Sequence, residues 1–351
     1  MPKFIPSIKR LSTEQKQVTP QVTDKERLQI GLALAKEKQL DEALVEFEAV
    51  LQNNPSSLPA HMGVGTIYYR QKRYDEAMSY FQRALQLDPL MSKAALKVGR
   101  IYLIRNELDK ALEEFQNVLN LDPKSTQAYA GIGQIFMKQK QYDAALQQFA
   151  KALRLNPQMV KARLLVAQIY KAQGKFPEAI ASLKTALSIN PELFLPYVLL
   201  GRLHLIQQEY VAAKEAFQTI IDKDMPRPAG NLAKFLGLAE ALIGVNELEE
   251  AANILRNLPE ADAVTAKKHK LFGDIYYAQG LFKQATEEYQ AAQLLASQEE
   301  NALDEFDNID ILLEQDDAQW EELAGSYKSS GKALISDSSN PQPSQRRISG
   351  L

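Results

Sequence analysis

The chain has 351 residues, with 41 Lys and Arg against 44 Asp and Glu, so its formal net charge at pH 7 is −3. A charge this close to zero gives no support for a nucleic-acid-binding or membrane-surface protein. The absence of cysteine excludes disulfide bonds and thiolate metal sites. No apolar run is long enough for a membrane-spanning helix, so none is expected.

The first segment, residues 1–23, carries basic residues among scattered apolar residues and prolines. We expect a disordered leader here, and docking of this segment to an anionic surface stays open. The segment lacks the apolar core of a secretory signal. A cytoplasmic or other intracellular soluble protein is therefore expected, and peripheral association with a membrane stays open.

From residue 24 onward, prolines recur every 34 residues, at Pro55, Pro89, Pro123, Pro157 and Pro191. Such a fixed period indicates a repeat architecture. Between the prolines, apolar residues follow the spacing of amphipathic helices, and each proline ends a helix. The pattern predicts two short helices per unit. One pair cannot bury its own apolar face, so each unit needs neighbours.

Numbered from the first residue of each 34-residue unit, three positions keep their residue type. Position 8 is small, at Gly31, Gly65, Gly99, Gly133, Ala167 and Gly201. Position 20 is alanine, at Ala43, Ala77, Ala111, Ala145, Ala179 and Ala213. Position 24 is bulky, at Phe47, Phe81, Phe115, Phe149, Leu183 and Phe217. Small residues at position 8 fit a place where two helices approach closely.

This pattern resembles the tetratricopeptide repeat (TPR) family. The resemblance implies an all-α fold, a right-handed α-solenoid of tandem helix–turn–helix repeats, with eight repeats over residues 24–299. Two prolines and a glycine predict a loop insertion near 228–231. The last two units, 232–265 and 266–299, follow it and lack the proline at position 32.

After the repeats, residues 299–322 contain eleven acidic residues and no Lys or Arg. Bulky apolar residues are set among them: Leu303, Phe306, Ile309, Leu312, Leu313 and Trp320. We expect a separate acidic apolar segment over 300–324. It is interpreted as a capping helix, as a peptide that docks on the chain's own groove, or as a docking peptide for another molecule. Residues 325–351 are rich in Ser, Gly and Pro and are expected to be disordered.

No catalytic constellation is present in the sequence. The three histidines, His61, His204 and His269, each take a helical repeat position, where packing explains them. Glycines occur singly at position 8, without a phosphate-binding loop. We expect neither enzymatic activity nor a cofactor or metal.

The resemblance implies that positions 2, 5, 9, 12 and 13 of each first helix face a concave groove. Eleven basic residues take these positions: Lys25, Lys36, Arg70, Lys93, Arg100, Lys138, Lys161, Lys171, Arg202, Lys267 and Lys270. The only acidic residues there are Glu240 and Asp274. Residues 24–299 as a whole hold 33 basic and 32 acidic residues, so the excess belongs to this face. Its predicted apolar floor comprises Leu96, Leu103, Ile104, Met137, Leu164, Val198 and Leu205.

A basic concave face concentrates an anionic partner. The sequence therefore predicts a protein-binding scaffold or assembly factor that holds an acidic peptide segment of another protein in the groove. RNA binding on the same face is the alternative. It is disfavoured by the near-neutral charge and by few groove aromatics for stacking, Tyr69 and Tyr277. DNA is not an expected partner.

Overall fold

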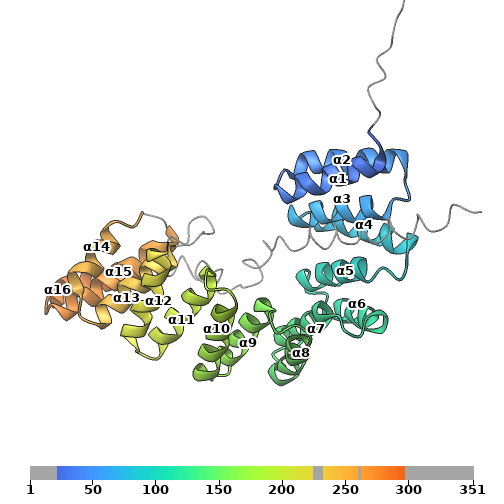
Figure 1. The fold of residues 1–351 in the computed structure, drawn as a ribbon. Helices are drawn as coiled ribbons and strands as arrows, with labels where there is room; N and C mark the ends of the chain where they lie inside the picture. The colour runs from blue at the N-terminus through green and yellow to red at the C-terminus, as the bar shows by residue number, and fades with distance from the viewer. Residues whose placement is uncertain (1–21, 224–231, 260–261, 297–351) are drawn as a thin grey trace, which may run out of the picture. The chain divides into compact units, whose positions relative to one another are not determined.

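The computed structural model describes residues 22–223, 232–259 and 262–296. These residues form sixteen α-helices, and no strand occurs within the described ranges (Figure 1). The predicted all-α repeat fold is confirmed, with two helices for each of the eight predicted repeats. Several predicted features lie wholly or almost wholly outside the described residues: the leader over 1–23, the insertion near 228–231, the acidic segment over 300–324 and the tail over 325–351.

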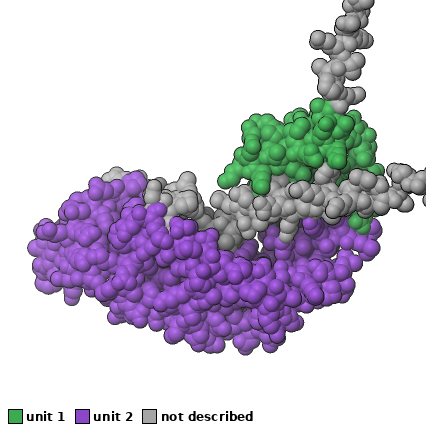
Figure 2. Space-filling model, viewed as in Figure 1, with its two compact units in different colours: residues 1–88, 317–351 green, residues 89–316 purple. Residues whose placement is uncertain are grey.

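The helices fall into two compact units (Figure 2). The first unit contains α1 (Asp24–Lys36), α2 (Leu40–Asn53), α3 (Leu58–Arg70) and α4 (Tyr74–Leu87). The second unit begins with α5 (Ser92–Ile104), α6 (Leu108–Leu121), α7 (Thr126–Lys138), α8 (Tyr142–Leu155), α9 (Val160–Ala172) and α10 (Phe176–Ile189). It continues with α11 (Phe194–Ile206), α12 (Tyr210–Asp222), α13 (Ala233–Gly244), α14 (Leu248–Arg256), α15 (Asp262–Ala278) and α16 (Phe282–Ala296).

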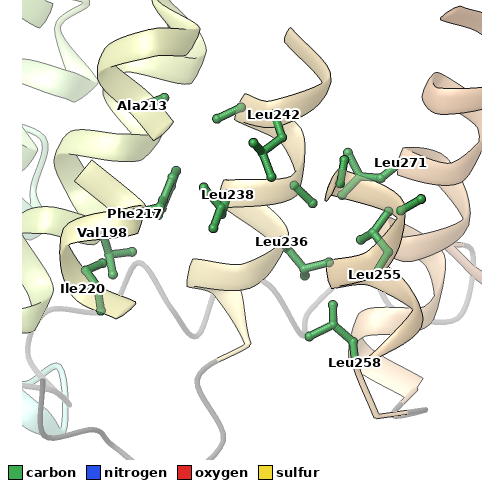
Figure 3. Packing of buried hydrophobic residues seen from close by; sticks show 14 of the residues in the cluster. Val198, Ala213, Phe217, Ile220, Leu236, Leu238, Leu242, Leu255, Leu258 and Leu271 are labelled. Carbon is green, nitrogen blue, oxygen red and sulfur yellow. The ribbon is translucent and has the colours of Figure 1, made fainter. Parts of the chain in front are cut away.

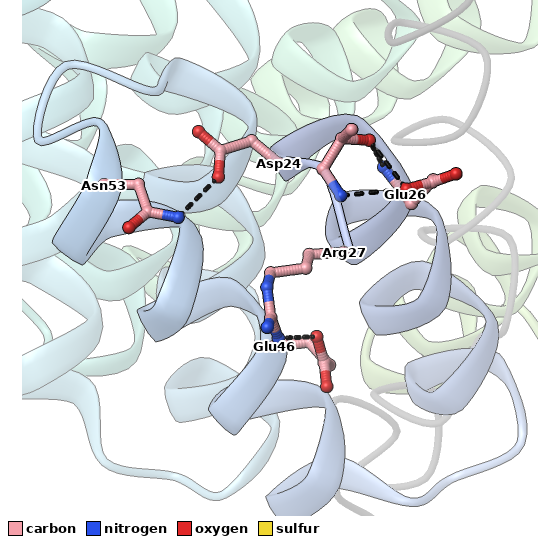
Figure 4. A network of polar contacts seen from close by, with 6 residues as sticks. Asp24, Glu26, Arg27, Glu46 and Asn53 are labelled. Atoms are coloured by element: carbon pink, nitrogen blue, oxygen red, sulfur yellow. Dashed lines mark hydrogen bonds and ion pairs between the residues drawn. The ribbon is translucent and has the colours of Figure 1, made fainter. Parts of the chain in front are cut away.

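The first helix begins with a capping box (Figure 4). The backbone N–H of Glu26 donates to the Thr23 hydroxyl, and the backbone N–H of Thr23 donates to the Glu26 carboxylate at 2.8 Å. This arrangement satisfies N–H groups that the first turn leaves without partners, and it lowers the pKa of Glu26. Arg27 and Glu46 form an ion pair of 2.8 Å that joins α1 to α2.

The turn inside every repeat has the same backbone conformation at position 15. All eight residues at this position have a positive φ between 59° and 77°: Lys38, Lys72, Asn106, Lys140, Gly174, Gln208, Asn246 and Gly280. The backbone N–H of Lys72 donates to the carbonyl of Tyr69, and that of Arg73 donates to the carbonyl of Tyr68. This pair of bonds is the Schellman arrangement, which ends a helix with one left-handed residue.

Position 15 gives a direct stability prediction. Left-handed backbone costs a residue with a Cβ about 1–2 kcal/mol. A Cβ at Gly174 would meet no atom within 4 Å, so the cost of the left-handed backbone is the only cost expected there. We expect Gly174→Ala to lower the free energy of unfolding by about 1 kcal/mol and Lys140→Gly to raise it by a similar amount. Urea unfolding measures both, and equal midpoints for the two variants would contradict the assignment.

The ring at position 24 lies between two helix backbones. A Cβ added at Gly99, in the same repeat, would lie 2.9 Å from the Phe115 ring. A Cβ added at Gly131, in the next repeat, would lie 2.5 Å from the same ring. Both distances are shorter than any real contact, so neither position has room for a side chain. Phe115 itself is fully buried. Each such ring therefore packs its own helix pair and the following repeat together.

Residue sizes at positions 8 and 24 compensate each other within one repeat. Six repeats pair glycine at position 8 with Phe or Tyr at position 24. The other two pair alanine with leucine: Ala167 with Leu183, and Ala239 with Leu255. All four of these residues are buried. The smaller leucine leaves room for the Cβ that the ring excludes.

A double-mutant cycle tests this compensation in the fourth repeat. A Cβ at Gly133 would lie 2.9 Å from the Phe149 ring. We expect Gly133→Ala to destabilise the chain by about 1–3 kcal/mol through overpacking. In the Phe149→Leu background, the same change should cost close to nothing. Chemical denaturation of the four proteins gives the coupling energy. Additive effects would show that the two positions do not share space.

The apolar core of the second unit runs from repeat to repeat. Figure 3 shows the part that extends from α11 to α15. Phe217 of α12 and Leu238 of α13 belong to it, followed by Leu255 of α14 and Leu271 of α15. Each residue is buried at 2% exposure or less. The core thus continues through nearest neighbours, as in a stack of repeats.

The seventh repeat departs from the predicted boundaries. Its second helix, α14, has 9 residues and ends at Arg256, three residues before Pro259. Position 32 of this repeat is Ala263, and a proline stands four positions earlier, at Pro259. Because proline disfavours helical geometry in its predecessor, α14 stops short. The next helix, α15, then begins at Asp262 and not at the predicted residue 266.

Candidate functional site

The first helices of successive repeats form one layer in each unit. In the first unit α1 contacts α3; in the second, α5 contacts α7, α7 contacts α9, α11 contacts α13 and α13 contacts α15. The second helices of neighbouring repeats within a unit approach one another less closely. The side on which the elements of a stack lie closest is its inner side. The first helices joined by these contacts therefore lie on the inner side of each unit, whereas α9 and α11 contact each other more weakly.

All eleven predicted groove cations lie on first helices. Lys25, Lys36, Lys138 and Lys270 are exposed. The others are half-buried: Arg70, Lys93, Arg100, Lys161, Lys171, Arg202 and Lys267. Lys25, Lys36 and Arg70 belong to the first unit and the other eight to the second. The candidate site below is confined to the second unit.

The predicted apolar floor is only partly at the surface. Leu96 and Met137 are half-buried, and Ile104 is exposed. Leu103 and Leu164, at 6% and 1% exposure, are buried in the core and not on the exposed floor that the sequence predicted. Val198 is likewise buried at 3%, whereas Leu205 is half-buried. Leu164 and Val198 take position 5, which packs against neighbouring helices.

The two acidic residues of the predicted face each pair with a predicted groove lysine. Lys267 of α15 lies 2.7 Å from Glu240 of α13, and Lys270 lies 2.9 Å from Asp274 on its own helix. The last two repeats are therefore electrostatically balanced on this face. The basic excess of the second unit lies on α5, α7, α9 and α11. Their groove positions hold six basic residues and no acidic one: Lys93, Arg100, Lys138, Lys161, Lys171 and Arg202.

A pocket of about 230 Å³ lies between α9 and α11, with α10 contributing to its wall. Two predicted groove cations, Lys171 of α9 and Arg202 of α11, line it together with Gln168. The remaining lining residues are apolar: Ala167, Ala172, Leu183, Leu199 and Leu203. The structure thus brings two of the predicted cations together around an apolar concavity.

The pocket coincides with a departure from the repeat pattern. Leu183 takes position 24, where five of the first six repeats have phenylalanine, and its partner at position 8 is Ala167. Both residues line the pocket. Leucine fills less volume than a phenyl ring, although the seventh repeat has the same alanine–leucine pair. Gln168, Leu183 and Leu199 are lining residues that the sequence did not predict. The change from Phe to Leu at position 24 was the available signal.

The histidines and groove tyrosines have structural surroundings. The Nε2 atom of His61 lies 2.9 Å from the carbonyl of Pro55. His204 pairs with Glu209, and His269 with Glu288, both at 2.6 Å. Tyr69, a predicted stacking residue, is buried at 7% exposure, whereas Tyr277 is 62% exposed.

Two features are absent from the residues that the structure describes. No group of three or more His, Asp or Glu side chains there is arranged to hold a metal ion. Among the described helices, none combines the length and apolar character needed to cross a membrane.

Tandem helix–turn–helix repeats whose first helices lie on the inner side define a helical-repeat scaffold. Residues 3–214 match the family model described as the tetratricopeptide repeat protein 21 N-terminal ARM repeat. Residues 195–311 match the tetratricopeptide repeat-like domain. The chain belongs to the tetratricopeptide repeat family. Proteins of this family are typically non-catalytic scaffolds for protein interaction, and the family membership supports a protein-interaction scaffold here in general terms. No curated protein sequence matches the chain significantly.

Solved structures agree with this fold. PilW, described as a widely conserved type IV pilus biogenesis factor, has a TM-score of 0.54 and 20% identity, covering 62% of this chain and 98% of PilW. A tetratricopeptide repeat protein from Parabacteroides merdae ATCC 43184 has a TM-score of 0.50 and 19% identity, covering 75% of this chain and 98% of that protein. At such identities, the likeness concerns the fold alone.

Proposed function

We propose that the chain holds an acidic peptide segment of another protein on the inner side of its second unit. The pocket between α9 and α11 would take one bulky apolar side chain of that segment. Lys171 and Arg202 would bind carboxylates on either side of it. The observation that carries this proposal is the meeting of two predicted groove cations with an apolar pocket.

The size of the pocket favours a side chain over a free small molecule. Pockets for small molecules and cofactors measure about 300–1,000 Å³. A volume of about 230 Å³ is smaller than that range. A buried apolar anchor supplies most of the affinity of such a contact, while surrounding charges increase the association rate and set orientation.

The neighbouring first helices extend the same chemistry. Lys93 and Arg100 on α5 and Lys138 on α7 take groove positions in the repeats before the pocket. Lys161 takes one on α9 itself. An extended acidic segment along these helices would meet basic residues at several points. Salt screens the attraction between such a row of charges and an acidic segment, because the Debye length is only about 8 Å at physiological salt. The attraction is therefore strongest at low ionic strength.

RNA remains the second outcome of the test. Binding of single-stranded RNA usually relies on aromatic side chains that stack on bases. The burial of Tyr69 removes one of the two predicted stacking residues. The observations therefore favour the peptide.

Two variants of the full chain separate the pocket from its charges. Ala167→Gly with Leu183→Phe restores the glycine–phenylalanine pair of the neighbouring repeats and should fill the pocket without loss of folding. Lys171→Gln with Arg202→Gln removes both charges and keeps the pocket. The probes are peptides selected by phage display on the unmodified chain, then synthesised and measured by fluorescence polarisation.

We expect selected peptides to combine acidic residues with a bulky apolar residue. Filling the pocket should weaken binding by about 10- to 100-fold, the equivalent of one buried apolar side chain. Removing the two charges should weaken it most at low salt. The matched control, Lys124→Gln with Lys184→Gln, removes two exposed charges outside the groove and should bind like the parent.

Three results would contradict the proposal. Selected peptides without acidic residues would remove the charge argument. An unchanged affinity of the pocket-filled variant would show that no apolar side chain of the peptide binds in the pocket. Binding of a labelled random RNA pool that depends on Lys171 and Arg202 but not on the pocket would move the function to RNA.

A further inference from the structure

The last turns of three first helices in the second unit carry no charged residue. Positions 12 and 13 of α11, α13 and α15 hold six small or apolar residues, here called the apolar strip: Leu205, Ile206, Ile243, Gly244, Tyr277 and Ala278. Helix α11 contacts α13, and α13 contacts α15, so these turns are neighbours on the inner side. In α7 and α9 the same two positions include Lys138 and Lys171.

The largest side chains of the apolar strip are in contact with solvent. Ile206 is 51% exposed, and Tyr277 is 62% exposed. Leu205 and Ile243 are half-buried and pack against the core of the second unit. Single exposed apolar residues are common on any protein, whereas contiguous ones mark interaction surfaces. The apolar strip therefore offers surface that a ligand would remove from water.

A neighbouring ring holds the Tyr277 ring in place. Phe282 of α16 makes an edge-to-face contact with it, and the two ring centroids lie 5.5 Å apart. The second repeat has the same pair of positions, Tyr69 and Tyr74, in the same arrangement at 5.6 Å. A ring that is already held by such a contact loses little conformational freedom when a ligand binds to it.

Position 13 of α13 has no room for a side chain. A Cβ added at Gly244 would overlap the Tyr210 ring of the preceding repeat. Gly244 is nevertheless exposed to solvent. A ligand can therefore approach the backbone of α13 closely at this point of the apolar strip.

The charges beside the apolar strip are paired with one another. Glu240 of α13 pairs with Lys267 of α15, and Asp274 pairs with Lys270. Asp274 also accepts a hydrogen bond of 2.9 Å from the Tyr289 hydroxyl. The inner side of the second unit thus has two parts. Its groove positions are basic from α5 to α11, and they are apolar with balanced charges from α13 to α15.

We propose that the ligand is a two-part peptide segment of another protein, with an acidic part on α5 to α11 and an apolar part on the apolar strip. This inference rests on the proposed function and adds a second contact surface for the same ligand. An acidic part on α13 and α15 would approach the carboxylates of Glu240 and Asp274. Charge complementarity therefore favours an uncharged part there.

The second unit sets the length of such a ligand. It has six first helices, α5, α7, α9, α11, α13 and α15. Packed helices lie about 8–10 Å apart, and an extended chain spans about 3.3–3.6 Å per residue. About 15 residues would therefore cross all six helices. A phage library of random peptides of about 20 residues is long enough to select a two-part ligand.

A variant of the full chain tests the apolar strip. Ile206→Gln with Tyr277→Gln removes its two most exposed side chains and should leave folding intact, which urea unfolding checks. The probe is the tightest-binding acidic peptide from this library, measured by fluorescence polarisation. We expect the variant to bind it about 10- to 50-fold more weakly, as for two partly buried apolar side chains. The matched control, Val45→Gln with Val211→Gln, changes two exposed valines on second helices and should bind like the parent.

Salt and a second peptide distinguish the two parts of the ligand. The loss caused by Ile206→Gln with Tyr277→Gln should be the same at low and high salt, because salt does not screen apolar contacts. The loss caused by Lys171→Gln with Arg202→Gln should shrink as salt rises. In the second peptide, serine replaces the apolar residues outside the acidic part. The parent chain and the Ile206→Gln, Tyr277→Gln variant should bind this peptide equally, which completes a double-mutant cycle.

Four results would overturn the inference. If the acidic peptide depends on Lys171 and Arg202 but not on Ile206 and Tyr277, the proposed function stands and the two-part ligand is wrong. If it depends only on Ile206 and Tyr277, the proposed function fails as well. A parent dimer that Ile206→Gln with Tyr277→Gln converts to a monomer, at unchanged peptide affinity, would mean that a second copy covers the apolar strip. Tighter peptide binding after Phe306→Ser with Trp320→Ser would mean that the chain's own acidic segment is the occupant.

Discussion

The structure depends on one packing constraint, a large side chain held between two helix backbones. Phe115 contacts Gly99 of its own repeat and Gly131 of the next one, with no room for a Cβ on either side. Such a ring is buried only when both neighbours are present. Single repeats are therefore unstable, and the chain must fold as a row of mutually supporting pairs. The exposed Tyr289 ring at the end of the row shows the same constraint without its second neighbour among the described residues.

The candidate pocket lies where this packing rule is relaxed. Leucine and alanine replace the ring and the glycine in the fifth repeat, and a concavity lies beside them. Lys171 and Arg202 lie at the same concavity because both take groove positions on adjacent first helices. The wall of the pocket thus includes a local departure from the repeat pattern, and two groove positions supply its charges.

The 34-residue period was enough to predict the helix pairs and the close approach at position 8, because both depend on short-range spacing. The period did not reveal the early end of α14, since Pro259 lies outside the expected register. Leu103 and Leu164 were misplaced because helical spacing shows which side a residue takes, but not how deeply neighbouring helices bury it. The pocket could not be predicted as a volume, although Leu183 departs visibly from the pattern. That the eleven basic residues form a binding surface remains a prediction.

The same departure has a consequence for engineering. Consensus design averages the repeats of a family and replaces rare residues with common ones, usually to gain thermal stability. Applied to this chain, averaging would install phenylalanine in place of Leu183 and glycine in place of Ala167. The product would be a more uniform array without this pocket. In arrays of this kind, a repeat that departs from the common residues is a first place to look for a binding site.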